Sequence, residues 1–109
     1  MRGTLDVIEN DINFSIKRVF TINAPGGAER GGHGHKKCQM ILICPYGTVE
    51  VVINNGLGRK SVLLDKSNKA LFLEPGDWHT MSFLKESVLV VLASEKYNKD
   101  DYIYNEPKN

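Results

Sequence analysis

The feature that most constrains the fold is a series of short apolar segments, rich in Val, Ile and Leu, which turn-forming residues separate at regular spacing. This pattern is typical of an all-β sandwich or barrel. Glycines and a proline make residues 23–32 a predicted loop, and residues 98–104 are expected to form a short helical turn. The strands that we expect cover residues 14–22, 37–44, 48–54, 60–65, 70–73, 79–83 and 87–94.

Length and charge narrow the class of protein. A chain of 109 residues predicts a single domain, residues 1–109. Its net charge of +1 gives no basic surface for nucleic acid. The apolar runs are too short to span a bilayer, and the first ten residues do not read as a signal peptide, so we expect a cytoplasmic protein without a membrane partner.

The expected strand at residues 37–44 is apolar on both faces. Alternation places Cys38 and Met40 on one face and Gln39 and Ile41 on the other. One face can line the interior, and the other needs a second sheet or a second subunit, so we expect a homodimer. Cys38 and Cys44 would lie roughly 20 Å apart along this strand, which predicts free, buried thiols rather than a disulfide.

The three histidines fall in two places. His33 and His35 lie in the stretch RGGHGHKKCQ at residues 30–39, and His79 follows the turn residues EPGDW. Two histidines that are two positions apart on a strand share a face, so both can reach one point inside a barrel. They can be metal ligands, proton-transfer groups or polar residues at a strand entrance. Gln39, which is expected to face the interior with them, is a poorer ligand than a carboxylate, and this argues against a metal site.

These motifs resemble the cupin superfamily, and more narrowly the nucleotide-sugar 3,4-ketoisomerases of the WxcM-like group. The resemblance rests on RGGHGHK at residues 30–36, LIC at 42–44, WHTM at 78–81, VLAS at 91–94, and Tyr97 followed by DYI at 101–103. The chain departs from the group's usual pattern at Phe20, where tyrosine is common, and at Gly34, where alanine is usual. Gln39 also stands where cupins carry an acidic residue.

The resemblance implies a jelly-roll cupin homodimer and an isomerase of deoxysugar biosynthesis. Its expected reaction moves a ketone from C4 to C3 of a dTDP-4-keto-6-deoxyhexose through an enediol or enediolate, without metal or cofactor. It implies His35 as the base at C3 and His33 as the group that shuttles or donates a proton. The implied substrate-binding residues are Arg18 and Arg30 at the phosphates, Trp78 at the thymine or sugar, and Gln39 and His79 nearby.

Two other functions remain open from the sequence. One is a metal-dependent cupin enzyme in which His33, His35 and His79 are the ligands. The other is a non-catalytic module that binds a sugar nucleotide. No glycine-rich nucleotide motif is present, so neither a dinucleotide nor a nucleoside triphosphate is indicated.

Overall fold

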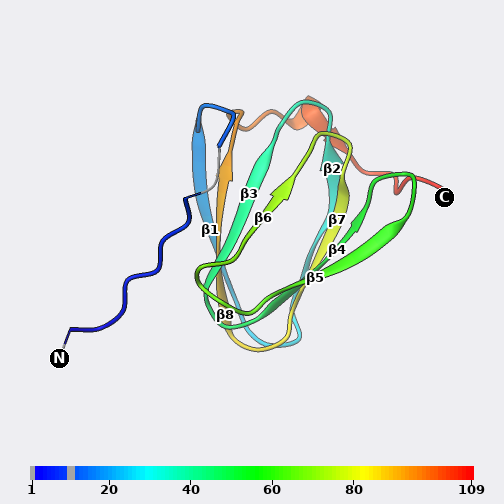
Figure 1. Ribbon diagram of the computed structural model, residues 1–109. Helices are drawn as coiled ribbons and strands as arrows, with labels where there is room; N and C mark the ends of the chain where they lie inside the picture. Colours follow the sequence, from blue (N-terminus) through cyan, green and yellow to red (C-terminus); the bar gives the residue numbers. More distant parts are fainter. Residues whose placement is uncertain (1, 10–11) are drawn as a thin grey trace.

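Two antiparallel β-sheets face each other in the computed structural model, which describes residues 2–9 and 12–109 (Figure 1). The first sheet has the strand order β1-β8-β3-β6 and the second has the order β5-β4-β7-β2-β9. The elements are β1 (Arg18–Ala24), β2 (Glu29–His35), β3 (Met40–Tyr46), β4 (Val49–Asn54), β5 (Arg59–Leu64), β6 (Ala70–Leu73), β7 (Trp78–Phe83), β8 (Ser87–Ala93), a 3-10 turn η1 (Lys99–Asp101) and β9 (Tyr102–Ile103).

The strand order is that of a jelly roll, because consecutive strands cross between the sheets instead of pairing side by side. Only β4 and β5 form a direct hairpin among the described residues, in register from Val49 opposite Leu64 to Asn54 opposite Arg59. The expectation of an all-β fold with two layers is therefore confirmed. The short helical turn expected near the C-terminus is also present, as η1.

The C-terminal boundary predicted for the loop at residues 23–32 is wrong. Strand β2 begins at Glu29, so the glycines before His33 lie within a strand. Gly31 and Gly32 have positive φ values of 91° and 79°, and the register with β7 shifts between Gly31 and His33. The glycines therefore form a β-bulge, which a sequence pattern does not separate from a loop.

The core lies between the two sheets. Every second residue of β3 and its approach, namely Cys38, Met40, Leu42 and Cys44, belongs to the core cluster. Ile41 and Ile43 lie on the outer face instead, beside Leu92 and Val90 of β8. Both cysteines are free and buried, as expected.

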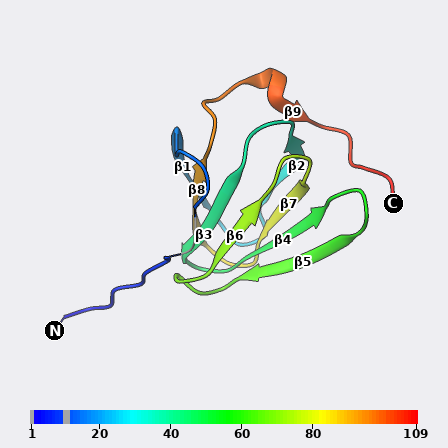
Figure 2. The same ribbon diagram turned by 45° about the horizontal axis from the view of Figure 1, so that its top comes forward.

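The C-terminal segment crosses one end of the sandwich and then runs along the outside of the second sheet (Figures 1 and 2). Trp78 Nε1 donates to the Tyr104 carbonyl at 3.1 Å. The buried Asn54 amide donates to Glu106 Oε2 at 2.9 Å and to the Pro107 carbonyl at 3.0 Å. These contacts fix the segment that carries β9.

Among the described residues, no helix has the length and apolar character needed to cross a membrane.

Candidate active site

Strand register brings four aromatic side chains to one face of the second sheet. His33 of β2 lies opposite His79 of β7, and His35 lies opposite Tyr102 of β9. Cross-strand partners share a face, and so do residues two apart on one strand. The four rings therefore project into the space between the two sheets, as expected for the histidines.

The bulge in β2 sets the position of this group. A side chain at Gly31 would place its Cβ 2.9 Å from the His79 carbonyl oxygen, and one at Gly34 would place it 2.9 Å from the Asp77 carbonyl oxygen. Both glycines thus let β2 approach the start of β7 more closely than any larger residue allows. This close approach brings His33 against His79.

The rings are in mutual contact. His33 lies 5.2 Å from His35 and 5.0 Å from His79 between ring centroids. The Tyr102 ring lies 4.8 Å from His33 and 4.5 Å from His35. Tyr104 stacks on the outer side of Tyr102 at 5.8 Å. The result is a compact cluster of three imidazoles and one phenol.

Asp101 holds the His35 ring from the C-terminal segment. His35 Nδ1 lies 3.2 Å from Asp101 Oδ2, and both side chains are buried. The same carboxylate accepts the Lys37 backbone N–H at 2.7 Å and the Cys38 backbone N–H at 3.2 Å. Because a carboxylate with these donors accepts hydrogen bonds, His35 carries its proton on Nδ1. Its Nε2 atom is buried and has no hydrogen-bond partner among the residues that the structure describes.

Burial keeps all three imidazoles uncharged at neutral pH. Desolvation is the largest cause that lowers the pKa of His33, of His35 and of His79, for which the pKa falls to about 4. Repulsion from His33 when it is protonated, and from the charge of Arg18, lowers the pKa of His35 further, while the Asp101 contact raises it. A neutral imidazole with a bare nitrogen is a base, which is the state that proton abstraction requires.

A small cavity of about 160 Å³ opens onto this cluster. His33, His79 and Tyr102 form its polar wall together with Arg30. His35 does not line it, and lies behind the rings of His33 and Tyr102. The apolar wall consists of Phe20, Ile22, Met40, Leu42, Met81 and Val91.

The structure brings the two predicted arginines to the site. Arg18 points inward from β1, with its guanidinium carbon 5.2 Å from the Phe20 ring centroid and 6.0 Å from that of Tyr97. Its Nε atom is buried without a partner. Arg30 is exposed at the edge of the cavity. Two guanidinium groups on this side suit an anionic ligand.

Two other predicted residues lie elsewhere, which corrects the sequence-based expectation. Gln39 is outside the core cluster and the cavity, between the inward-facing Cys38 and Met40, and its backbone pairs with Ser94. Trp78 does not line the cavity either, because alternation along β7 turns His79 inward and Trp78 outward onto the C-terminal segment.

Asp101 and Tyr102 were missed as site residues. Their only sequence signal is the DYI string at residues 101–103, which carried the family resemblance without a role for either side chain. The contact between His35 and Asp101 spans 66 positions of the chain. Local spacing gives no indication of a pairing at that separation.

The three histidines do not form a metal-binding group in the described part of the chain. The one set of three candidate ligands whose atoms lie within 4.8 Å of one another is His35, Cys38 and Asp101. In that set the carboxylate already accepts two backbone N–H groups and the His35 ring. The donors of His33, His35 and His79 therefore do not fit a shared ion in the geometry observed.

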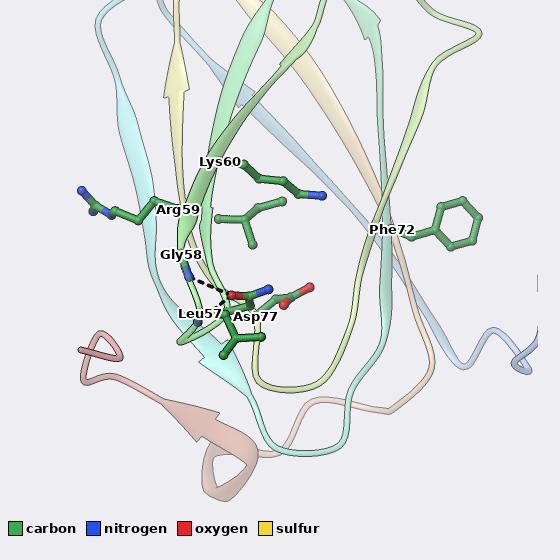
Figure 3. Close-up of a pocket in the computed structure, with 8 residues that line it drawn as sticks. Leu57, Gly58, Arg59, Lys60, Phe72 and Asp77 are labelled. Atoms are coloured by element: carbon green, nitrogen blue, oxygen red, sulfur yellow. Dashed lines mark hydrogen bonds between the residues drawn. The ribbon is translucent and has the colours of Figure 1, made fainter. Parts of the chain in front are cut away.

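A larger hollow of about 350 Å³ lies between β5 and β6, and Figure 3 shows it in close-up. Lys60 extends into it, whereas the Arg59 and Phe72 side chains point away. It shares no lining residue with the histidine cavity. The histidines and Tyr102 therefore lie at the smaller cavity and not at this one.

A family profile described as "FdtA: WxcM-like, C-terminal" matches residues 1–108. The chain belongs to the FdtA family. One relative, the TDP-4-oxo-6-deoxy-alpha-D-glucose-3,4-oxoisomerase of Aneurinibacillus thermoaerophilus, is 41% identical over 106 residues, which is 94% of this chain and 76% of that protein.

Solved structures of sugar 3,4-ketoisomerases superpose on this chain. The sugar 3,4-ketoisomerase QdtA of Thermoanaerobacterium thermosaccharolyticum, in complex with TDP, superposes with a TM-score of 0.82 at 36% identity, covering 94% of this chain and 75% of that one. A mutant of QdtA in complex with TDP-4-keto-6-deoxyglucose gives a TM-score of 0.82 at 35% identity, with the same coverage of 94% and 75%.

Proposed function

We propose that this protein is a sugar-nucleotide 3,4-ketoisomerase that converts a TDP-4-keto-6-deoxyhexose into its 3-keto isomer in deoxysugar biosynthesis. The relative and the solved structures support this class of reaction and of ligand. The observation that carries the proposal is the state of His35, whose Nδ1–H faces the Asp101 carboxylate while its buried Nε2 has no partner. The Nε2 atom of such an imidazole can accept one proton.

The reaction needs a base and a means to stabilise the oxyanion. His35 is the base that removes the C3 proton, which the adjacent ketone makes acidic. The sugar enters beside His33 and Tyr102, whose rings line the cavity in front of His35. His33 is the second catalytic imidazole and lies next to the reacting carbons. His79 bounds the far side of the sugar, since its ring packs against that of His33.

The diphosphate binds to Arg18 and Arg30. The buried, unpartnered Nε of Arg18 and the exposed guanidinium of Arg30 at the cavity edge support this assignment. A guanidinium fork matches two phosphate oxygens. We assign no sugar contact to Gln39 or Trp78, because neither side chain lines the cavity.

The active protein is a homodimer of the cytoplasm, and this too is our proposal. The outer face of the first sheet supports the dimer, since it presents Val19, Ile43, Val90 and Leu92 without a charged side chain among them. Val19 alone has 59% of its surface exposed. An apolar face of this kind is a common site of association.

The test is incubation of the purified protein with TDP-4-keto-6-deoxyglucose in heavy water, followed by proton NMR. We expect deuterium at C3 of the recovered 4-keto substrate, and a 3-keto product that carries deuterium at C4. TDP binding without exchange would indicate a binding module, and stoichiometric metal that is lost in His33→Ala would indicate a metal enzyme. Either result would overturn the proposal.

Asp101→Asn tests the observation that carries the proposal. The variant removes the negative charge that orients the His35 ring, so we expect turnover to fall by roughly 10²-fold or more while TDP binding persists. Asp100→Asn is the matched control, because the Asp100 side chain is exposed, and the carboxylate that contacts His35 is that of Asp101. His35→Asn should abolish exchange, and retained exchange there would remove His35 from the role of base.

A further inference from the structure

The imidazole N–H groups of the site are directed at protein oxygens. His35 directs its Nδ1–H to Asp101, and His79 directs its Nδ1 to the Asp77 carbonyl at 3.5 Å. The Gly31 backbone raises the pKa of His33 and so opposes part of the effect of burial. A backbone carbonyl that accepts a hydrogen bond from the ring has this effect. A neutral imidazole has one N–H, so each of these rings presents a bare nitrogen to the cavity or its surroundings.

Bare nitrogens accept protons and cannot donate them. The isomerisation also needs a donor, because the carbonyl oxygen at C4 becomes a hydroxyl group. Arg30 can donate a hydrogen bond at the cavity edge, but a guanidinium does not give up its proton in a protein. Another group must therefore deliver the proton.

Tyr102 carries the one hydroxyl group among the residues that line the cavity in the described part of the chain. Position 20, on the opposite wall, is phenylalanine and adds none. The Tyr102 ring contacts both His33 and His35, and β9 pairs it directly opposite His35. A sugar in the cavity therefore meets the phenol, and the base lies in contact with that same ring.

We propose that Tyr102 is a catalytic residue that gives a proton to the substrate oxygen at C4 and recovers one from the oxygen at C3. This assigns to Tyr102 the donor role at oxygen that the sequence had assigned to His33, and it rests on the proposed ketoisomerase function. In the first half, the C3–H bond breaks and its proton moves to His35 Nε2. The bonding pair forms the C3=C4 double bond, and the former carbonyl oxygen takes the Tyr102 proton.

The second half reverses both transfers at the neighbouring atoms. The Tyr102 phenolate removes the proton of the C3 hydroxyl, the C3=O bond forms, and the electron pair of the double bond takes the proton from His35 at C4. Both side chains return to their starting states, and no oxidant, reductant or metal is consumed. One phenol therefore serves both oxygens.

The decisive variant is Tyr102→Phe, which keeps the ring that packs on the imidazoles and removes the hydroxyl. We expect isomerisation to fall by roughly 10²–10⁴-fold, with C3 exchange in heavy water falling less, because exchange needs only the base. TDP affinity should stay within about threefold of wild type. A structural role of the ring would instead lower exchange and isomerisation together.

Tyr104→Phe is the matched control, since Tyr104 stacks on Tyr102 but does not line the cavity. The inference fails if Tyr102→Phe isomerises within about threefold of wild type, or if His33→Asn loses isomerisation while Tyr102→Phe keeps it. Wild type that turns over nothing contradicts the proposed function instead. If Tyr102→Phe does not fold, 3-fluorotyrosine at this position decides, because its more acidic phenol must move the alkaline limb of the rate profile to lower pH.

Discussion

At the scale of single residues, hydrogen bonds and burial set the tautomer and the charge of the side chains in the site. Asp101 holds the proton of His35 on Nδ1, and buried surroundings lower the pKa of all three histidines. The sequence predicted the histidines because their spacing is visible in the chain. It did not predict Asp101 or Tyr102, whose positions depend on a strand pairing between distant segments.

His79 makes stability depend on pH. The folded protein keeps His79 neutral down to about pH 4, whereas the unfolded chain binds the same proton near the ordinary pKa of 6.5. The unfolded state therefore binds more protons between these values, and the free energy of unfolding falls as the pH falls. From about pH 7.5 to pH 5 we expect His79 to account for a loss of about 2 kcal/mol.

Urea unfolding of wild type and His79→Gln at both pH values measures this difference. The glutamine variant has no titrating group at position 79, so its stability should change less with pH by about the same amount. Equal pH dependence in the two proteins would show that His79 titrates in the folded state as it does in the unfolded chain.

At the scale of the strand, β2 shows why a glycine-rich stretch that is expected to form a loop can form a strand instead. Glycines usually mark loops, but Gly31 and Gly32 here adopt positive φ inside a strand and move its register against β7. Apolar strands such as β6, Ala70–Leu73, were predicted with correct bounds because their composition carries the signal. The functional strand lacks that signal, since its residues serve close approach rather than packing.

Alanine at the two bulge glycines separates backbone strain from close approach. Both substitutions place a side chain at positive φ, which costs roughly 1–2 kcal/mol. Only at Gly31 does the new Cβ also meet backbone, at 2.9 Å from the His79 oxygen, while Gly32 has nothing within 4 Å. We expect Gly31→Ala to lower the free energy of unfolding by about 1–3 kcal/mol more than Gly32→Ala. Equal losses would mean that β7 can move aside.

At the scale of the whole molecule, the first strand of the chain, β1, is an edge strand of one sheet and the last, β9, is an edge strand of the other (Figure 2). The order of apolar segments and turns predicted an all-β sandwich or barrel, and the family resemblance implied the jelly roll. The sequence could not show where the C-terminal segment attaches, because Asn54, Arg59 and Glu106 form that anchor through side chains far apart in the chain. That residues 1–109 form one domain stays a prediction.

Val19→Glu tests the proposed dimer. Val19 is exposed on the outer face of β1, so a charge there leaves the core untouched but is desolvated if a second subunit covers it. We expect the variant to sediment with the mass of one chain and wild type with that of two. Leu57→Glu is the control, since Leu57 is 92% exposed and follows β4 in the turn to β5. A wild-type protein that sediments as a monomer at micromolar concentration refutes the dimer.

The place of β9 in the chain has a consequence for biosynthesis. Asp101 and Tyr102 follow the eight longer strands, so the ribosome adds them after nearly all of the sandwich has been made. Until then His35 has no carboxylate to orient it, and the face that Tyr102 covers is open. In the proposed mechanism, the capacity for proton transfer is thus among the last properties that the growing polypeptide acquires.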